Sequence, residues 1–248
     1  MREIRRQQGK VALVIGGSRG IGEAIVRRLA EEGATVLFTY LSSVERASRL
    51  AAELSAVGTV NAVQADSSDP IALRAAITDV GRRHGRIDYL VSNAAISLTR
   101  AVADFPPEDF DRMIRTNITP LFTAVQAVLP FMPEGGRIVA IGSTLATRTF
   151  FPGASVYAMT KAAVASLIRG FAVDLASRQI TANTVQPGPT ATDMSPDDGP
   201  RANALRQHVP LRRLGQDHEI AALVAFLLGP YAAFITGAAL TADGGLNA

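Results

Sequence analysis

A phenol and an amine lie four residues apart in the segment SVYAMTK, as Tyr157 and Lys161. In a helix, this spacing places the two side chains on one face, a single turn apart. A phenol titrates near 10, so it needs a nearby cation to stabilise its phenolate and bring its acidity toward neutral pH. Such a pair could give a proton to the oxygen of a carbonyl group during its reduction. A lysine that only extends past a half-buried tyrosine to reach solvent has the same spacing. The surrounding elements must therefore decide between a catalytic pair and a structural one.

Strand-like and helix-like segments alternate along the whole chain. Continuous apolar strands separated by helices predict a parallel sheet that is covered on both faces. The fold class is therefore predicted as α/β, with a doubly wound sheet of about seven strands. The expected strands are residues 11–16, 35–40, 60–65, 87–92, 137–143, 180–186 and 238–241. The first two expected helices end near Glu32 and Ala56. The later ones occupy residues 69–84, 108–129, 157–177 and 219–228.

The composition is that of a folded, enzyme-sized body. Of 248 residues, 48% are hydrophobic and 19% are charged, and the net charge of +3 is spread along the chain, so we expect no nucleic-acid partner. The chain has no cysteine and its three histidines show no ligand spacing, so we expect no metal and a cytoplasmic location. Residues 220–240 carry no charge, but Gly229 and Pro230 interrupt them, which favours a buried helix and a strand over a membrane span.

Two segments fall outside this alternation. The basic start of the chain, residues 1–9, lacks the apolar stretch of a secretory signal and is expected to be an exposed tail. Residues 187–200 are too rich in Pro, Gly and Asp for a regular element, and a loop of this length often covers an active site. We therefore expect residues 187–210 to form a mobile substrate loop within a single domain that spans residues 1–248.

A glycine-rich turn follows the first expected strand. Gly16, Gly20 and Gly22 stand where the strand gives way to a helix, and glycine permits close approach of the backbone to a pyrophosphate. The end of the second strand, residues 39–42, has no carboxylate to bond a ribose 2′-hydroxyl, whereas Arg19 could pair with a 2′-phosphate. The pattern favours NADP(H) over NAD(H); the alternative is a plain turn with a solvated arginine.

Five motifs in register with the expected strands resemble the short-chain dehydrogenase/reductase family over essentially the whole chain. They are GGSRGIG from Gly16, Asn93-Ala94-Ala95, Ser143, Tyr157-x-x-x-Lys161 and Pro187-Gly188. The resemblance implies a Rossmann-like fold and reversible hydride transfer between NADP(H) and a carbonyl or alcohol group. Three positions depart from the family pattern, and each could weaken cofactor binding without removing a catalytic group. Ile15 stands where the family usually has a Thr, Ala95 where it usually has a Gly, and Gln186 where it usually has an Asn.

The resemblance also implies a role for each motif. Tyr157 would donate the proton, Lys161 would tune it and bond the nicotinamide ribose, and Ser143 would hold the substrate oxygen. Asn117 would connect Lys161 to solvent through a backbone carbonyl and a water, which completes the implied catalytic set. Besides Tyr157 and Lys161, the implied cofactor contacts are Gly16, Ser18, Arg19, Gly20, Ile21, Tyr40, Leu41, Ser42, Asp66, Ser67, Asn93, Ala94, Ala95, Pro187, Gly188, Thr190 and Thr192.

The expected substrate pocket lies between the catalytic serine and tyrosine, at Thr144, Leu145, Phe150 and Phe151. Two aromatic side chains suit a hydrophobic or aromatic ketone, unless they pack beneath the loop or at a subunit contact. We therefore expect an NADPH-dependent carbonyl reductase that also works in reverse as an alcohol dehydrogenase. The small-molecule carbonyl or alcohol is the expected partner, and no membrane is involved.

Two other functions stay open from the sequence. In a 3-oxoacyl-(acyl-carrier-protein) reductase, Arg178 would suit the acidic carrier protein, but Glu134 opposes such docking, so this partner is not favoured. A non-catalytic NADP(H) sensor or scaffold is the alternative from another class. The helix at 108–129 and the helix that carries Tyr157 resemble the pair that joins subunits in this family, so we expect a homotetramer, with a dimer as the alternative.

Overall fold

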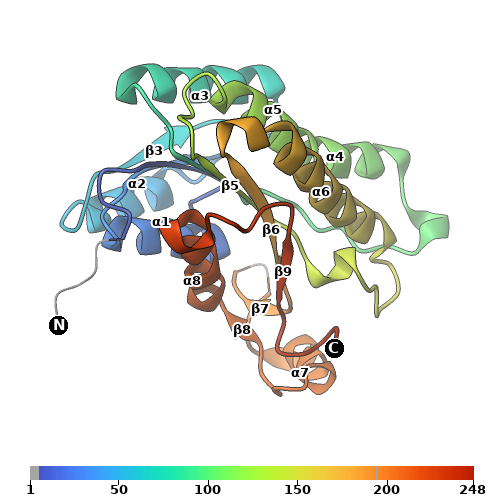
Figure 1. Cartoon of the computed structure of the whole chain (residues 1–248). Helices are drawn as coiled ribbons and strands as arrows, with labels where there is room; N and C mark the ends of the chain where they lie inside the picture. The colour runs from blue at the N-terminus through green and yellow to red at the C-terminus, as the bar shows by residue number, and fades with distance from the viewer. Residues whose placement is uncertain (1–5, 194) are drawn as a thin grey trace.

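The computed structural model describes residues 6–193 and 195–248 (Figure 1). Within these residues, seven parallel strands form one sheet in the order β3-β2-β1-β4-β5-β6-β9. The register pairs Val11 of β1 with Thr35 and Ala12 with Tyr89, so β1 lies between β2 and β4. The predicted doubly wound sheet is therefore confirmed. The strands are β1 Val11–Ile15, β2 Thr35–Tyr40, β3 Val60–Gln64, β4 Tyr89–Ser92, β5 Arg137–Ile141, β6 Thr181–Pro187 and β9 Ala239–Ala242.

Helices cover both faces of the sheet because successive residues of a strand point to opposite sides. In β1, Ala12 and Val14 belong to the core cluster beneath α1, α2 and α8, whereas Leu13 and Ile15 belong to the cluster beneath α3, α5 and α6. Figure 1 shows these two layers, with α4 beside α6. Burial on both faces explains why the strands are continuously apolar. The helices named here are α1 Gly20–Glu31, α2 Val44–Leu54, α3 Pro70–His84, α4 Pro107–Asn117, α5 Thr119–Val128, α6 Ser155–Asp174 and α8 Asp217–Leu228.

The single helix expected at residues 108–129 is two helices, which corrects the sequence prediction. The chain leaves α4 after Asn117 and begins α5 at Thr119. Pro120 causes the break, because proline has no N–H to donate to the carbonyl of Thr116 and its ring would clash with that carbonyl. The break matters for the site, because it places Asn117 at a helix end.

The loop expected at residues 187–210 contains regular structure, which is a second correction. Thr190 and Ala191 form the short strand β7, which pairs in parallel with β8 (Gly215–Gln216). A ten-residue helix, α7 (Gly199–His208), follows, and Pro200 in its first turn suits a helix start because proline needs no partner for an N–H there. Residue 194 lies outside the described residues. Figure 1 shows α7, β7 and β8 together with the C-terminus at one side of the molecule.

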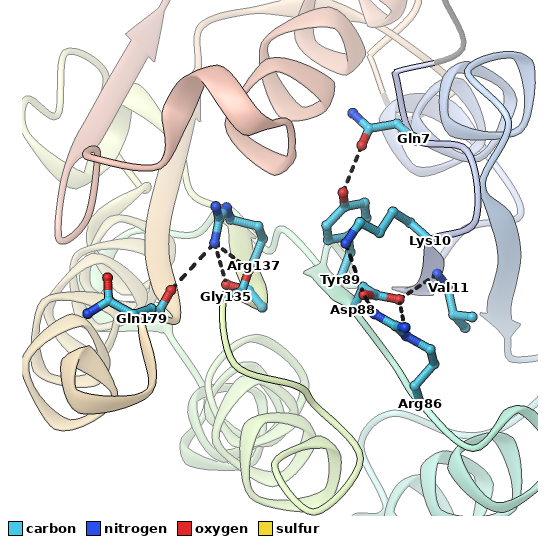
Figure 2. Close-up of polar contacts among 10 residues, drawn as sticks. Gln7, Lys10, Val11, Arg86, Asp88, Tyr89, Gly135, Arg137 and Gln179 are labelled. Carbon is cyan, nitrogen blue, oxygen red and sulfur yellow. Dashed lines mark hydrogen bonds and ion pairs between the residues drawn. The ribbon is translucent and has the colours of Figure 1, made fainter.

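The start of the described chain is anchored rather than exposed at Gln7, which corrects part of the expected tail; residues 1–5 lie outside the described residues. Gln7 is buried, its Nε2 donates to the carbonyl of Ala225 at 3.2 Å, and its Oε1 accepts from the Tyr89 hydroxyl at 2.8 Å. Figure 2 shows this contact beside a buried carboxylate, Asp88, that accepts from Val11 N at 2.9 Å and pairs with Lys10 and Arg86. These groups lie where β1 and β4 begin.

The opposite edge, where the strands end, gathers the polar motifs. Because the sheet is parallel, the carboxyl ends of neighbouring strands meet at one edge. Gly16 follows β1, Asn93 follows β4, Ser143 follows β5 by two residues and Gly188 follows β6. In the sheet, β2 lies on one side of β1 and β4 lies on the other, so the strand order reverses between β1 and β4. Parallel sheets of this kind bind ligands in the crevice at such a reversal.

Among the described helices, α6 alone is long and apolar enough to span a membrane by length and composition. Half of its apolar window is buried, and the helix contacts β5, β6 and α4. It is therefore accounted for as a core helix. The uncharged segment at 220–240 divides into α8, a short 3-10 turn η4 (Pro230–Ala232) and β9, as predicted.

Candidate active site

The glycine turn after β1 is held by the ends of two neighbouring strands. Gly16 has a φ of +80°, its N–H donates to the Thr39 hydroxyl at 2.9 Å, and its carbonyl accepts from Asn93 Nδ2 at 2.7 Å. The Ile15 carbonyl also accepts from the backbone N–H groups of Asn93 and Ala94. Isoleucine at position 15 therefore leaves the turn tied to β4 by other groups. The role of Thr39 was missed from the sequence because a strand threonine carries no local signal.

The first turn of α1 has the properties of a phosphate site. Arg19 is the N-cap residue and its side chain does not cap the helix, so backbone N–H groups of the first turn stay free for an anion. A Cβ atom at Gly22 would lie 2.1 Å from the Gly16 carbonyl oxygen, so the backbone here is as close as glycine allows. Gly20 adopts a φ of +52°, and a Cβ atom there would lie 3.3 Å from the Thr192 side chain. Thr192 thus reaches the glycine turn from a distant segment.

The expected adenosine side lies at the ends of β2 and β3. Tyr40 is half-buried, whereas Leu41 and Ser42 are exposed at the rim. Asp66 Oδ1 accepts from the N–H and hydroxyl of Ser68, which orders the turn after β3. Arg19 is exposed, and a second cation unnoticed in the sequence, Arg46 of α2, pairs with Asp193. With no carboxylate among residues 39–42 and two arginines at this corner, the residues fit a 2′-phosphorylated dinucleotide.

The expected nicotinamide side follows β6. The Gly188 N–H donates to the Ala242 carbonyl at 2.9 Å, and a Cβ atom at Gly188 would lie 2.6 Å from Asp243 Cα. The Thr190 hydroxyl donates to the Gly188 carbonyl at 2.9 Å, which closes a tight turn after Pro187. The buried side chain of Gln186 accepts from the hydroxyls of Thr147 and Thr241, so the departure from asparagine at this position is accommodated by two partners.

Tyr157, Lys161 and Ser143 come together at the end of β5. Lys161 is buried and its Nζ donates to the Ile141 carbonyl at 2.8 Å, while Nζ lies 5.7 Å from the centre of the Tyr157 ring. The Ser143 hydroxyl lies near the phenol of Tyr157 and lowers its pKa, and it accepts from the Leu145 N–H at 3.2 Å. The one-turn spacing therefore places the pair beside the hydroxyl of a different element.

The pKa values of this pair differ from the expectation that Lys161 makes Tyr157 more acidic. Burial raises the pKa of Tyr157 to about 12, and the Ser143 hydroxyl offsets only part of that rise. Burial lowers the pKa of Lys161 to about 8. The cause is that the protein interior disfavours both charged forms. In this state Tyr157 is a protonated acid, which suits proton donation to a substrate oxygen.

Asn117 holds the adjoining loop and helix together. Its Oδ1 accepts from the Ile96 N–H at 2.8 Å, and its Nδ2 donates to the Ile96 carbonyl at 2.9 Å. Nδ2 also lies 3.1 Å from the Thr160 hydroxyl, which donates to the Tyr157 carbonyl at 2.8 Å. Asn117 is therefore linked to the tyrosine helix through Thr160, a residue that sequence reasoning missed. The break at Pro120 allows this side chain to meet Ile96 from a helix end.

The residues expected around the substrate divide into two groups. Thr144 and Leu145 lie in the short 3-10 helix η2 (Thr144–Ala146) directly after Ser143. Phe150 and Phe151 stack edge to face with 5.1 Å between ring centres, and Phe150 lies 6.0 Å from the His208 ring at the end of α7. The contact with His208 matches the alternative that the two aromatic side chains pack against the segment 187–210. Both phenylalanines lie in the loop that joins η2 to α6.

The basic residue considered for carrier-protein docking lies at the other edge of the sheet. Arg178 Nη2 donates to the carbonyls of Leu129 and Met132, shortly before β6 begins at Thr181. Its guanidinium therefore closes the end of α5, far along the strands from Ser143. The expected use of Arg178 at the mouth of the site is wrong. Among the described residues, no group of three or more His, Asp or Glu side chains could hold a metal ion.

Replacing Gly22 by alanine is expected to weaken NADPH binding by about tenfold or more. The added Cβ would lie 2.1 Å from the Gly16 carbonyl oxygen and 2.5 Å from Asn93 Nδ2, so the turn that receives the phosphates must shift. Fluorescence titration of NADPH measures the change. Gly58→Ala is the matched control, because its added Cβ would lie 3.4 Å from the Ala30 carbonyl oxygen, which is an ordinary contact distance. Equal NADPH affinity in the two variants would contradict this placement of the cofactor.

Comparisons with known proteins support the family that the sequence motifs resemble. The family model described as enoyl-(acyl carrier protein) reductase matches residues 15–247. The cyclic-di-GMP-binding biofilm dispersal mediator protein of Escherichia coli is 44% identical over 97% of this chain and 98% of its own. The 3-oxoacyl-(acyl-carrier-protein) reductase FabG of Staphylococcus aureus is 38% identical over 96% of this chain and 98% of its own.

Solved structures agree in both fold and cofactor. A short-chain dehydrogenase/reductase from Serratia marcescens is 48% identical with a TM-score of 0.96, covering 98% of this chain and 100% of that one. A short-chain dehydrogenase from Burkholderia cenocepacia, solved in complex with NADP, is 46% identical with the same TM-score and coverage. The glycine turn, the crevice between β1 and β4 and these likenesses lead to one conclusion. The chain belongs to the short-chain dehydrogenase/reductase family and is an NADP(H)-dependent oxidoreductase that acts on CH–OH and C=O groups.

Proposed function

We propose that the chain reduces a small hydrophobic or aromatic ketone or aldehyde with NADPH, and that Tyr157 donates the proton. The observation that carries the proposal is the cluster of Ser143, Tyr157 and Lys161 at the end of β5, where the phenol lies near a hydroxyl and beside a buried amine. The neighbouring pair Phe150 and Phe151 supports an apolar substrate. The pKa of Tyr157, about 12, keeps the phenol protonated, which is the form that donates a proton in the reductive direction.

In this proposal each side chain has a separate task. When bound, NADPH supplies the hydride that the carbonyl carbon accepts. The Ser143 hydroxyl donates a hydrogen bond to the carbonyl oxygen and so polarises it, and Tyr157 gives its proton to the same oxygen as negative charge develops there. The Lys161 ammonium, held by the Ile141 carbonyl, stabilises the phenolate that is left. Asn117 fixes Ile96 and Thr160 and thereby the start of the tyrosine helix.

Steady-state assays with paired substrates and cofactors test this proposal. Aryl ketones and an acetoacetyl thioester would each be offered with NADPH and with NADH. The proposal expects the higher kcat/KM for aryl ketones and for NADPH. A preference for the thioester would instead support the 3-oxoacyl-(acyl-carrier-protein) reductase function, which is favoured by the 38% identity to FabG. Turnover of neither substrate class, with tight NADPH binding, would support a sensor function.

The E. coli relative gives that sensor function a specific form. Its name describes a cyclic-di-GMP-binding protein, and it is 44% identical to this chain. The exposed Arg19 and the Arg46–Asp193 pair lie at the corner where a phosphate-bearing ligand would bind. Calorimetric titration with cyclic-di-GMP, with and without saturating NADPH, distinguishes the two ligands. Competition between them would place both at this corner, and no heat of binding would remove this second candidate.

The rate of NADPH-dependent reduction is expected to fall as pH rises through about 8. Burial lowers the pKa of Lys161 to about 8, so the amine is charged below that pH and neutral above it. A neutral amine no longer stabilises the phenolate, while Tyr157 itself keeps its proton up to about 12. The measurement is kcat/KM for NADPH against pH, which reports groups of the free enzyme. In Lys161→Arg, whose guanidinium stays charged, the break at 8 should vanish; its persistence would assign it to another group.

A homotetramer in the cytoplasm remains our expectation for the assembled protein. Two of the groups of exposed apolar side chains lie on separate parts of the surface, which suits the two interfaces that a tetramer with three two-fold axes needs. Light scattering coupled to size exclusion measures the state, and Phe234→Glu is expected to reduce a tetramer to a dimer. The first group is Phe110, Phe122 and Val173 on α4, α5 and α6, and the second is Phe226, Tyr231 and Phe234 on and after α8.

A further inference from the structure

The last residues of the chain cross the carboxyl edge of the sheet beside Ser143. After β9, Asp243 accepts from the Gly245 N–H through Oδ1 and from the Asn247 N–H through Oδ2, both at 2.9 Å. Gly244 and Gly245 adopt φ values of +64° and +89°, which let the chain turn back tightly. The segment 243–247, called here the C-terminal strap, is therefore a defined turn built on one carboxylate.

The C-terminal strap contacts the nicotinamide side and the end of α7. Asp243 packs against Gly188, where a Cβ atom would approach to 2.6 Å. The Gly244 carbonyl accepts from the Leu211 N–H at 3.2 Å, and a Cβ atom at Gly244 would lie 2.7 Å from the Val209 side chain. The strap is thus fitted between the segment after β6 and the segment after α7.

The strap also exchanges hydrogen bonds with the turn that carries Ser143. Asn247 Nδ2 donates to the carbonyl of Thr144 at 3.0 Å, and Arg148 Nη1 donates to the carbonyl of Leu246 at 3.4 Å. Thr144 is buried, and its carbonyl also accepts from the N–H groups of Thr147 and Arg148, which follow η2. Asn247 Oδ1 is buried without a partner within residues 6–193 and 195–248, so the bond to Thr144 is what orients this amide.

We propose that Asn247 is a positioning residue that sets the Ser143 hydroxyl for the reaction. Ser143 is the N-cap of η2 and its hydroxyl accepts from the Leu145 N–H, so the placement of η2 fixes the placement of the hydroxyl beside Tyr157. Asn247 fixes η2 from 103 residues away in the sequence. The strap thereby couples Ser143 to the segments that carry Gly188 and Leu211. The inference rests on the proposed role of Ser143.

Asn247→Asp tests the proposal, because aspartate keeps the shape of the side chain but cannot donate to the Thr144 carbonyl when ionised. We expect kcat for the best ketone to fall by about tenfold or more, with KM for NADPH nearly unchanged. The melting temperature should fall by a few degrees, because the carboxylate faces the Thr144 carbonyl without a donor. Asn203→Asp is the matched control: it adds the same charge on α7 and keeps the Oδ1 atom that accepts from Arg206. Its kcat should equal that of the wild type.

A double-mutant cycle separates positioning from general support of the fold. In a Ser143→Ala background, Asn247→Asp should cause no further loss of kcat, because the hydroxyl that it positions is gone. Equal losses in both backgrounds, or no loss in Asn247→Asp alone, would overturn the inference while leaving the proposed function standing. A Ser143→Ala variant with full kcat would instead overturn the role of Ser143 in the proposed function.

Discussion

Replacing Tyr157 by phenylalanine is expected to lower kcat for ketone reduction by about 10²- to 10⁴-fold while leaving NADPH affinity almost unchanged. Phenylalanine keeps the ring that lies near Lys161 and removes the hydroxyl that lies near Ser143. The substrate oxygen then has no acid beside it, and water must supply the proton. Steady-state kinetics give kcat, and fluorescence titration gives the dissociation constant of NADPH.

Tyr89→Phe is the matched control for this loss. Tyr89 also has a buried hydroxyl, whose one partner among the described residues is Gln7 (Figure 2). Tyr89 lies where β4 begins, at the other edge of the sheet. Its replacement should lower the free energy of unfolding by about 1 kcal/mol and leave kcat unchanged. Equal kcat in Tyr157→Phe and the wild type would mean that the proton comes from another group, and the account of the site would be wrong.

The second large effect is expected for Lys161→Met. Methionine fills much of the space of the lysine stem but has no amine to bond the Ile141 carbonyl and no charge to stabilise the phenolate. We expect kcat/KM for the ketone to fall by about 10²-fold or more. The change should lower the free energy of unfolding by about 1–3 kcal/mol at most, because the Ile141 carbonyl loses this donor while the stem is replaced by a side chain of similar size.

Lys10→Met controls for the loss of a lysine, since the chain has only these two. Lys10 is partly exposed and pairs with Asp88 at the amino-terminal edge, so its loss should affect neither kcat nor NADPH binding. Thermal unfolding checks that both variants are folded. A Lys161→Met variant that keeps full kcat/KM would contradict the electrostatic role of the amine.

Much of the fold could be predicted from the sequence because the signals are local. Buried parallel strands are continuously apolar, and the segments predicted as strands appear as such in the sheet. The break of α4 from α5 was missed although its cause, Pro120, is visible in the sequence, because the apolar periodicity continues across it. α7 was missed for the opposite reason: its residues show little apolar periodicity, and only Ala202 in it is buried.

The candidate site also has a part that could be predicted from the sequence and a part that could not. The positions of Ser143, Tyr157 and Lys161 follow from motifs and from the rule that parallel strands end at one edge. Their protonation could not be predicted, because the pKa of Tyr157 depends on how deeply the folded chain buries it. The partners that orient the site, such as Thr39 for Gly16 and Asn247 for Thr144, come from distant segments and leave no pattern in the sequence.

The transfer of deuterium from NADPH labelled at C4 to an aryl ketone tests the central claim most directly. With the wild type, and with each face of C4 labelled in turn, one label should appear at the carbinol carbon of the product, in step with NADP formation. Tyr157→Phe should bind the labelled cofactor with the same affinity and transfer deuterium about 10²- to 10⁴-fold more slowly. Bound NADPH with no deuterium in any alcohol product, or equal transfer rates in the two proteins, would contradict the account.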